Sequence, residues 1–480
     1  MQTYGNYING EWLTSGPTFE NINPANTDEI VGLFVKATAA DVDAAADAAA
    51  AAFPKWAAMA APARANILFK AADILESRFD QIAAEMTREE GKTFPEAKGE
   101  CRRTINILKY FAGEGSRMGG HLVPSERDRV HMFAIRKPIG VVGLVTPWNF
   151  PSAIPCWKLA PALICGNTVV IKPASAAPLS AWRIIEALRE AGIPKGVVNF
   201  VAGSGGTLGK ALVEAKPLKA ISFTGSESIG KWIHTEASKR MLRIQLEMGG
   251  KNPTIVLKDA DFNAAVENVA NAAFFSTGQK CTATSRAIVE DEIYDKFVAA
   301  LVERTKKLKV GNGMEAGIDI GPAVDEAALN AILEYIEIGK KEHGAPVVGG
   351  NRLTGGAFDK GYYVEPTIFA DVKEDARIAK EEIFGPVLTV HRASNFEDAL
   401  RMANSTQYGL SASVQTSNVS RVFDFVYGAE AGLLTVNLPS AGVEYQLPFG
   451  GTKDSSFGPK EQGPAAFDFY SDYKTIYLKY

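Results

Sequence analysis

The sequence predicts an α/β protein built on parallel sheets. From His131 onwards, short apolar runs alternate with helical stretches, which is the pattern of strand–helix–strand units. The runs Val141–Val145, Thr168–Ile171 and Val197–Val201 are almost wholly apolar, as expected for strands that are buried on both faces. The chain has 480 residues, of which 46% are hydrophobic, so it has the length of about three domains and ample material for a core.

The sequence before this block predicts a hairpin followed by helices. Tyr7–Trp12 carries a strand–turn–strand pattern. The alanine-rich segment Ala39–Phe53 predicts a helix, with Thr38 or Asp41 as the N-cap and Pro54 closing the helix. Amphipathic helices are expected to follow over Arg64–Gly91 and Pro95–Gly115.

A second alternating block begins near Thr254. Its apolar runs predict strands at Thr254–Leu257, Ala287–Val289, Pro386–Val390 and Gly432–Val436. The last stretch, Thr475–Tyr480, alternates like an exposed edge strand, which is a liability unless it is paired. It is expected to be an oligomerisation strand, together with Met132–Arg136, or to pair within its own subunit, and both possibilities remain open at this point.

Composition and charge exclude several classes of protein. Lys and Arg number 51 against 55 Asp and Glu, a net charge of −4, so no basic signature indicates binding to nucleic acid or to an anionic membrane. The longest uncharged run, Pro138–Trp157, is interrupted by prolines and is read as a buried strand entering a loop. Four cysteines without CxxC spacing, and no signal peptide, predict a reduced cytoplasmic protein. No cluster with the spacing of metal ligands is present, so no metal is expected.

Several residues have side chains suited to catalysis. Cys281 lies among polar residues next to Lys280, and a nearby cation favours the nucleophilic thiolate. Glu247 precedes a Gly-Gly turn, where a partly buried carboxylate can act as a base. Asn149 and Lys172 follow two predicted buried strands, at the edge where α/β proteins bind ligands. Taken alone, each also fits an ordinary structural role: a core thiol, a solvated carboxylate, or a turn residue.

Together, these residues belong to a series of motifs in a characteristic order and spacing: Pro147–Pro151, Lys172-Pro173, Phe223–Ser226, Leu246–Lys251, Gly278–Cys281, Glu382–Pro386 and Pro448–Gly451. The series closely resembles the NAD(P)-dependent aldehyde dehydrogenase superfamily. The resemblance extends from the N-terminal hairpin to the C-terminal strand.

The resemblance implies a fold with three parts. A Rossmann-like cofactor-binding domain would comprise residues 1–120 and 140–245, and an α/β catalytic domain residues 246–445. A β-arm for oligomerisation would combine residues 121–139 and 460–480. A homodimer or homotetramer is implied.

The resemblance also assigns roles to the site residues. Cys281 would attack the aldehyde to give a thiohemiacetal and then a thioester, Asn149 would hold the oxyanion, and Glu247 would activate water. The matching cofactor-binding residues are Thr146, Trp148, Lys172, Ser175, Gly225, Ser226, Gly230, Glu382 and Phe384. Phe150, Trp157 and Phe449 are expected to line the substrate tunnel.

The cofactor is expected to be NADP or NAD. Many NAD-preferring members carry Glu where this sequence has Ser175. A carboxylate there would favour NAD and repel the 2′-phosphate of NADP. The serine therefore predicts that NADP is at least accepted.

The substrate signal comes from the stretches 277–286 and Ser440–Glu444, which resemble α-ketoglutarate semialdehyde (2,5-dioxopentanoate) dehydrogenases. Succinate semialdehyde enzymes usually carry arginines at the positions matching Trp157 and Phe275, which are absent here. Succinate semialdehyde and glyceraldehyde-like sugar aldehydes remain as alternatives. Glu247 counts against a CoA-acylating enzyme, and Glu247 together with Cys281 counts against a non-catalytic relative.

Overall fold

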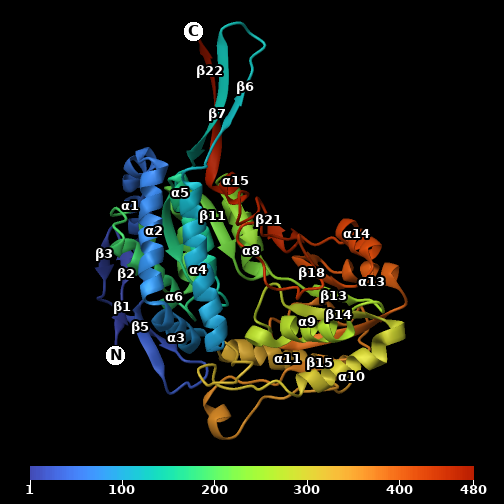
Figure 1. Cartoon of the computed structure of the whole chain (residues 1–480). Helices are drawn as coiled ribbons and strands as arrows, with labels where there is room; N and C mark the ends of the chain where they lie inside the picture. The colour runs from blue at the N-terminus through green and yellow to red at the C-terminus, as the bar shows by residue number, and fades with distance from the viewer.

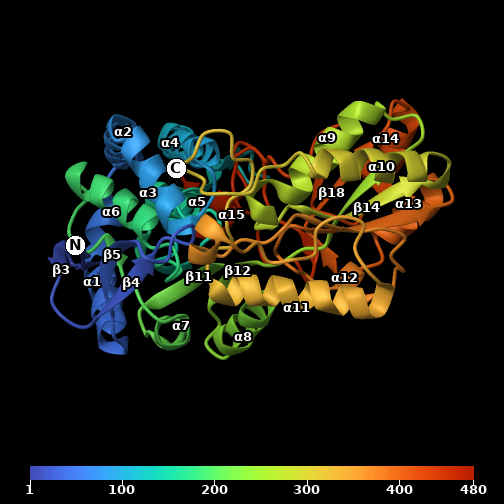
Figure 2. The ribbon, with the colours of Figure 1, turned by 90° about the horizontal axis from the view of Figure 1, so that it is seen from below.

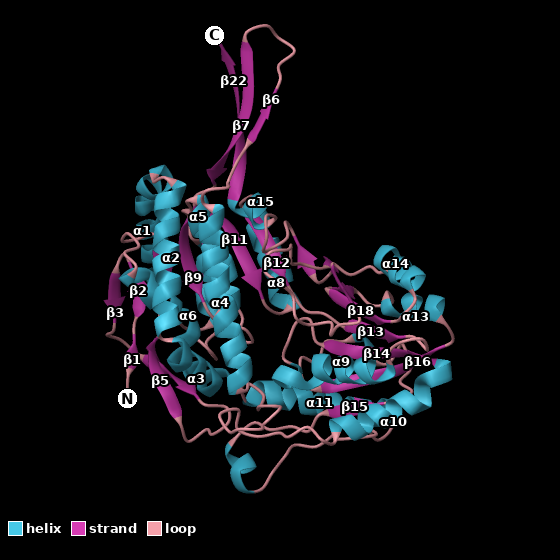
Figure 3. Ribbon diagram, viewed as in Figure 1, coloured by secondary structure: helices cyan, strands magenta, loops and turns pink.

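Two sheets of mainly parallel strands organise the chain, for which a computed structural model describes all 480 residues (Figures 1 and 3). The larger sheet has the strand order β21-β12-β11-β8-β9-β10-β2-β3. Its centre is the predicted parallel block, and the N-terminal hairpin and β21 add antiparallel strands at the two edges. The strands are β2 (Asn6–Ile8), β3 (Glu11–Leu13), β8 (Val141–Val145), β9 (Thr168–Lys172), β10 (Val198–Phe200), β11 (Leu218–Thr224), β12 (Arg243–Glu247) and β21 (Ser456–Phe457).

The second sheet is entirely parallel, with the order β15-β16-β14-β13-β18-β19. It lies on the opposite side of the molecule from the first, as Figure 2 shows. Helices α9 (Phe262–Phe274) and α10 (Tyr294–Thr305) share one apolar cluster with it, and α13 (Phe396–Ala403) and α14 (Val419–Gly428) share another. The strands are β13 (Asn252–Val256), β14 (Thr284–Glu290), β15 (Thr367–Phe369), β16 (Val387–Ala393), β18 (Ser411–Gln415) and β19 (Leu433–Val436).

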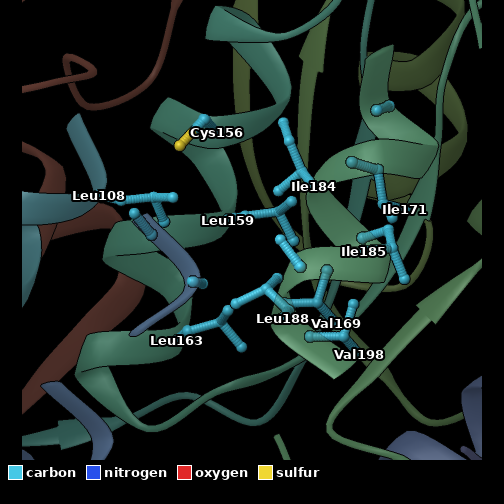
Figure 4. Packing of buried hydrophobic residues seen from close by; sticks show 14 of the residues in the cluster. Leu108, Cys156, Leu159, Leu163, Val169, Ile171, Ile184, Ile185, Leu188 and Val198 are labelled. Atoms are coloured by element: carbon cyan, nitrogen blue, oxygen red, sulfur yellow. The ribbon is translucent and has the colours of Figure 1, made fainter. Parts of the chain in front are cut away.

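The largest apolar core lies between the first sheet and its helices. All residues of α5 (Ala153–Cys165) are buried, because the helix is sandwiched between the sheet and α2 and α4. Leu159 and Leu163 of α5 lie near Ile184 and Leu188 of α6 in the same cluster as Val169 of β9 (Figure 4). The surrounding helices are α2 (Ala61–Ser77), α3 (Phe79–Glu90), α4 (Phe94–Glu114) and α6 (Leu179–Glu190), with α1 (Ala39–Ala58), α7 (Gly205–Glu214) and α8 (Glu227–Ser238) contributing to a second cluster.

Two of the predicted helices have different bounds. Helix α1 does begin at Thr38, which forms a capping box with Asp41, but it continues through Pro54 to Ala58. A proline removes one backbone donor, and Trp56, which is buried in the core, packs the last turn in place. The helix predicted over Arg64–Gly91 is in fact two helices, α2 and α3, which are separated at Arg78.

A three-stranded sheet projects from the body of the molecule (Figure 1). It consists of β6 (His121–Val123), β7 (Val130–Pro138) and the C-terminal β22 (Ser471–Lys479). Strand β22 pairs antiparallel with β7, from Ser471 opposite Pro138 to Lys479 opposite Val130. The C-terminal strand is therefore paired within its own chain. The boundaries given above for the three domains remain a prediction.

The remaining elements are short, apart from α11. They comprise a small sheet of β1 (Thr3–Tyr4), β4 (Thr18–Ile22) and β5 (Ile30–Val35), the pair β17 (Tyr408–Gly409) and β20 (Thr452–Lys453), and the helices α11 (Glu326–His343), α12 (Arg377–Lys380) and α15 (Ala466–Tyr470). No helix combines the length and the apolar character needed to cross a membrane.

Candidate active site

Cys281 lies at the junction of two cavities and is the one residue that lines both. The larger cavity has a volume of about 390 Å³ and is bounded by residues of α4, α5 and the loop that contains Phe449. The smaller cavity has a volume of about 260 Å³ and opens at the ends of β8 and β11. A thiol in this position can contact a molecule in each of the two cavities.

A left-handed stretch of backbone sets the position of Cys281. Ser276, Thr277 and Gly278 have φ values of 54°, 56° and 65°. At Gly278 a Cβ atom would lie 2.3 Å from the carbonyl oxygen of Gly385, so only glycine fits there. Strain of this kind is typical of functional sites, where surrounding contacts hold an unusual conformation.

The electrostatic setting of Cys281 differs from the prediction. Burial, together with the nearby carboxylates of Glu247 and Glu382, raises the pKa of the thiol to about 12. The expected activation by Lys280 is wrong, because the Lys280 Nζ donates instead to the Asn271 carbonyl, at 3.3 Å. Burial also lowers the pKa of Lys280, to about 8. The thiol therefore needs a base rather than an adjacent cation.

Asn149 is held in place by one hydrogen bond from its side chain and one to its backbone carbonyl. Its side-chain Nδ2 donates to the carbonyl of Gln279 at 3.0 Å, and its own carbonyl accepts from Lys92 Nζ at 2.7 Å. Asn149 and Cys281 both line the smaller cavity. The second N–H of the side-chain amide makes no hydrogen bond within the protein, so it can donate to a molecule in the cavity.

Glu247 ends β12 and is buried, although it lines neither cavity. Burial and the Glu461 carboxylate raise its pKa to about 8, against the lowering effect of a hydrogen bond from Ser456. At Gly450 a Cβ atom would lie 2.6 Å from Glu247 Oε1, so glycine permits the close approach. A carboxylate with this pKa can both accept and release a proton near neutral pH.

Ser456 and Glu461 escaped the sequence reasoning. Ser456 lies on β21, a two-residue strand too short to leave a pattern. Glu461 forms a buried ion pair with Lys158 of α5, whose ammonium also donates to Ser222 at 2.7 Å. Nothing in the local sequence indicates that these distant groups surround Glu247.

The smaller cavity collects five of the predicted cofactor-binding residues, namely Trp148, Gly225, Ser226, Glu382 and Phe384. The rings of Trp148 and Phe384 meet edge to face with centroids 5.4 Å apart. Glu382 accepts a hydrogen bond of 2.9 Å from the backbone N–H of Gly250, and burial raises its pKa to about 7. This carboxylate is therefore fixed in the cavity wall.

The other four lie outside that cavity. Thr146 and Lys172 follow or end the adjacent strands β8 and β9, at the same sheet edge. The Lys172 Nζ donates to the Pro173 carbonyl at 2.8 Å, and burial lowers its pKa to about 8. Ser175 donates its hydroxyl to the Gly203 carbonyl at 2.7 Å. A Cβ at Gly230 would lie 2.4 Å from Met248 Sδ, which indicates a packing role there.

The three predicted substrate residues, Phe150, Trp157 and Phe449, all line the larger cavity. Trp157 and Phe449 have ring centroids 5.3 Å apart, and Lys92 Nζ lies 4.5 Å from the ring centroid of Phe150. Aromatic rings therefore form part of the wall of the larger cavity, and the Lys92 ammonium lies beside one of them.

Comparison with known proteins identifies the family. The aldehyde dehydrogenase family matches residues 12–476. The chain belongs to the aldehyde dehydrogenase family. It is similar to the alpha-ketoglutaric semialdehyde dehydrogenase of Bacillus subtilis, with 48% identity over 100% of this chain and 99% of the relative. The alpha-ketoglutarate semialdehyde dehydrogenase of Haloferax volcanii is 45% identical over 99% of each chain.

Solved structures confirm the predicted aldehyde dehydrogenase fold. A betaine aldehyde dehydrogenase from Staphylococcus aureus in complex with NAD⁺ superimposes with a TM-score of 0.96 at 34% identity, covering 99% of this chain and 94% of that one. An aldehyde dehydrogenase from Bacillus cereus also has a TM-score of 0.96, at 35% identity over 100% and 97% of the two chains. The chain is an NAD(P)-dependent aldehyde dehydrogenase.

The smaller cavity of this aldehyde dehydrogenase has features that fit a dinucleotide. The hydroxyl of Thr224, which lines the cavity at the end of β11, is buried and has no hydrogen-bond partner in the protein, and the same holds for Thr146, just outside the cavity after β8. Helix α8 begins directly after Ser226, so its unpaired backbone N–H groups face the same region. Unpaired buried hydroxyls are rare, and a bound polar molecule would satisfy them.

One face of α4 gives this aldehyde dehydrogenase a charged cavity wall that sequence reasoning missed. Glu96, Gly99, Glu100 and Arg103 line the larger cavity with the i, i+3, i+4, i+7 spacing of a single helix face. The amphipathic pattern of α4 predicts a helix with one apolar face, but it does not show what the polar face contacts. The signal that could have revealed this wall is the set of charged residues at helical spacing on a largely buried helix.

Proposed function

We propose that this aldehyde dehydrogenase oxidises a semialdehyde that carries a carboxylate, with α-ketoglutarate semialdehyde as its best substrate. The observation that carries the proposal is the larger cavity, in which Cys281 shares one space with aromatic rings and with Lys92, Arg103 and Lys280. The names of the relatives at 44–48% identity support it. A cavity of about 390 Å³ is within the usual range for small-molecule sites.

In the proposed reaction the sulfur of Cys281 adds to the aldehyde carbon, and the thiol proton leaves to a base or to water. The oxygen gains negative charge, which the Asn149 Nδ2 and the Cys281 backbone N–H stabilise. When bound, the nicotinamide cofactor supplies a hydride acceptor. The sulfur then carries the acyl group as a thioester, which remains activated toward water.

Glu247 is proposed to act in the second half of the reaction. Its raised pKa, about 8, makes it basic enough to take a proton from water that attacks the thioester. The products are the carboxylate and the free thiol. The buried Lys158–Glu461 pair lies behind Glu247 and keeps a second carboxylate close to it.

We further propose that NADP is accepted at least as well as NAD. Ser175 places no negative charge near the expected adenosine end, and Lys172 lies at the neighbouring strand end. Lys172 and Ser175 both donate to backbone carbonyls, so each would exchange that bond for a ribose or phosphate oxygen.

The projecting sheet supports the proposal of a homodimer or homotetramer. Leu122, Ile135, Tyr477 and Leu478 are exposed on it, and a thin sheet of three strands cannot cover both of its faces. The mass of the parent in solution should exceed 51.5 kDa, and deletion of residues 471–480 should reduce it. A parent that is monomeric at micromolar concentration would contradict the proposal. The free state of all four cysteines supports the proposed cytoplasmic location.

The substrate proposal is tested by steady-state kinetics with matched aldehydes and with both cofactors. We expect the highest kcat/KM with α-ketoglutarate semialdehyde, lower values with succinate semialdehyde and glyceraldehyde, and the lowest with pentanal, which has the same chain length but no carboxylate. Free CoA should not accelerate turnover or appear in the product. Preference for pentanal over both semialdehydes would refute the proposal.

A further inference from the structure

Arg103 is the cationic side chain of the larger cavity with the most unused hydrogen-bond donors: the carboxylates of Glu100 and Glu444 act on its charge, but neither forms an ion pair with it. Lys92 is buried and pairs with Glu100 at 2.5 Å. Lys280 is fully enclosed and donates to a backbone carbonyl, and the carboxylate of Glu96 acts on it. Arg103 forms no ion pair, and its Nη2 donates only to the carbonyl of Val443.

The acidic residues of the same wall, Glu96 and Glu100, already accept hydrogen bonds from other groups. Glu100 Oε1 accepts the backbone N–H groups of Ser152 and Ala153 at 2.8 and 3.0 Å, while Oε2 accepts Lys92. Glu96 belongs to the N-terminal cap of α4 and also accepts the backbone N–H of Ser276 at 2.7 Å. These carboxylates are held by several donors each and are not free to turn toward Arg103.

The position of Arg103 on α4 exposes its guanidinium to the cavity. Gly99 lies one turn before it on the same face, and a Cβ atom built there would meet no atom within 4 Å, so the space beside Arg103 is open. The bond to Val443 tethers the guanidinium to the loop across the cavity and uses one of its several N–H donors. The remaining donors have the planar arrangement that suits a carboxylate.

We infer that Arg103 is a specificity-determining residue, which binds the carboxylate of the substrate while the aldehyde carbon meets Cys281. The inference rests on the proposed function and assigns its charge selectivity to one side chain on α4. Trp157 and Phe449 would enclose the carbon chain between the two ends. A substrate without a carboxylate would leave the guanidinium without its anionic partner and would bind more weakly.

The test is the kinetics of Arg103→Met and Arg103→Lys with α-ketoglutarate semialdehyde and with pentanal. The charge-assisted hydrogen bonds lost in Arg103→Met should lower kcat/KM for the semialdehyde about 10- to 100-fold, chiefly through KM. The loss with pentanal should be much smaller. Arg103→Lys keeps the charge but not the planar donors, so an intermediate loss is expected. The matched control is Arg102→Met, because Arg102 is exposed, pairs with Glu76 at 2.5 Å and lies outside the cavity.

The outcomes separate the inference from the function on which it rests. If the parent does not prefer the semialdehyde to pentanal, the proposed function fails. If the parent does prefer it and Arg103→Met keeps that preference, the function stands and the assignment of Arg103 is overturned. Equal losses with both aldehydes would show a structural role and would also overturn the assignment. If Arg103→Met does not fold, as judged by its circular dichroism, the ratio of the two KM values in Arg103→Lys decides.

Discussion

Ser456 donates a hydrogen bond of 2.5 Å to Oε2 of Glu247, across the register that pairs β21 with β12. The contact opposes the effects of burial and of Glu461, and so keeps the pKa of Glu247 lower than it would otherwise be. A two-residue strand at the edge of the larger sheet therefore tunes the group that we propose as the catalytic base.

This relationship predicts a shifted pH profile in Ser456→Ala. Because a base must be unprotonated, activity should be lost in the parent as the pH falls below the Glu247 pKa of about 8. Removing a hydrogen bond to a charged group should raise that pKa, and move the acidic limb of the kcat profile upward, by about one pH unit. Lys460 and Lys158 remain to lower the pKa in both proteins. Ser456→Thr should restore the parental profile, and identical profiles in the alanine variant and the parent would contradict this.

The buried carboxylate also predicts a pH-dependent cost to stability. In the folded protein Glu247 keeps its proton up to about 8, whereas in the unfolded chain it titrates near its ordinary value of 4.5. Stability from this group is thus full below about 4.5 and is lost as the pH rises toward about 8.

Glu247→Gln removes this titration, so its Tm should exceed that of the parent at about pH 9 and the gap should narrow toward about pH 5. Scanning calorimetry across this range provides the measurement. Glu214→Gln, at an exposed position on α7, is the control and should show no such trend. A gap between Glu247→Gln and the parent that does not vary with pH would count against a raised pKa.

Thiol labelling should single out Cys281. Cys101, Cys156 and Cys165 are buried in the core, whereas Cys281 is partly exposed and lines both of the large cavities. Burial raises the pKa of all four thiols, so access rather than acidity should decide the order. Mass spectrometry after brief treatment with iodoacetamide should find Cys281 modified first, with faster reaction at higher pH. Earlier modification of any core cysteine would show that the cavities do not admit the reagent to Cys281.

The cofactor proposal predicts that Ser175→Glu shifts preference from NADP to NAD. A carboxylate at this position would repel a 2′-phosphate, and a charge pair at ~4 Å with an effective dielectric constant of ~20 costs ~4 kcal/mol before screening by salt. We expect the ratio of kcat/KM for NADP to that for NAD to fall roughly tenfold or more. Ser175→Ala, which removes only the hydroxyl, should change the ratio less. The idea fails if the parent uses NAD alone or if the glutamate leaves the ratio unchanged.

Much of the fold could be predicted because its central strands are buried on both faces. Val141–Val145 is a continuous apolar run, and it forms β8 with the same bounds. The predicted end of α1 at Pro54 was wrong, because packing of the buried Trp56 outweighs the one hydrogen bond that the proline removes. The break at Arg78 was missed because amphipathic periodicity continues through it.

For the site, the order of the motifs identified residues that line the cavities, whereas the charge of a sequence neighbour did not predict the state of the Cys281 thiol. Asn149 follows β8 and Cys281 lies in the turn that precedes β14, and both line the smaller cavity, so two motifs far apart in the sequence meet there. The effect expected of Lys280 was wrong because neighbours in sequence need not direct their charges toward each other. Arg103 and Glu461 were missed because nothing in the sequence indicates that one face of α4 and a C-terminal segment reach the site.

The central claim is that Cys281 carries the acyl group as a thioester until Glu247 activates the water that hydrolyses it. It is tested most directly by mixing Glu247→Gln with α-ketoglutarate semialdehyde and NADP, then quenching with acid. A positioned base contributes roughly 10²–10⁴-fold, so the thioester should accumulate after one burst of reduced cofactor. Peptide mass spectrometry should then find the acyl group on Cys281, and Cys281→Ala should give neither burst nor adduct. A burst without an adduct on Cys281, or normal turnover in Cys281→Ala, would contradict the account.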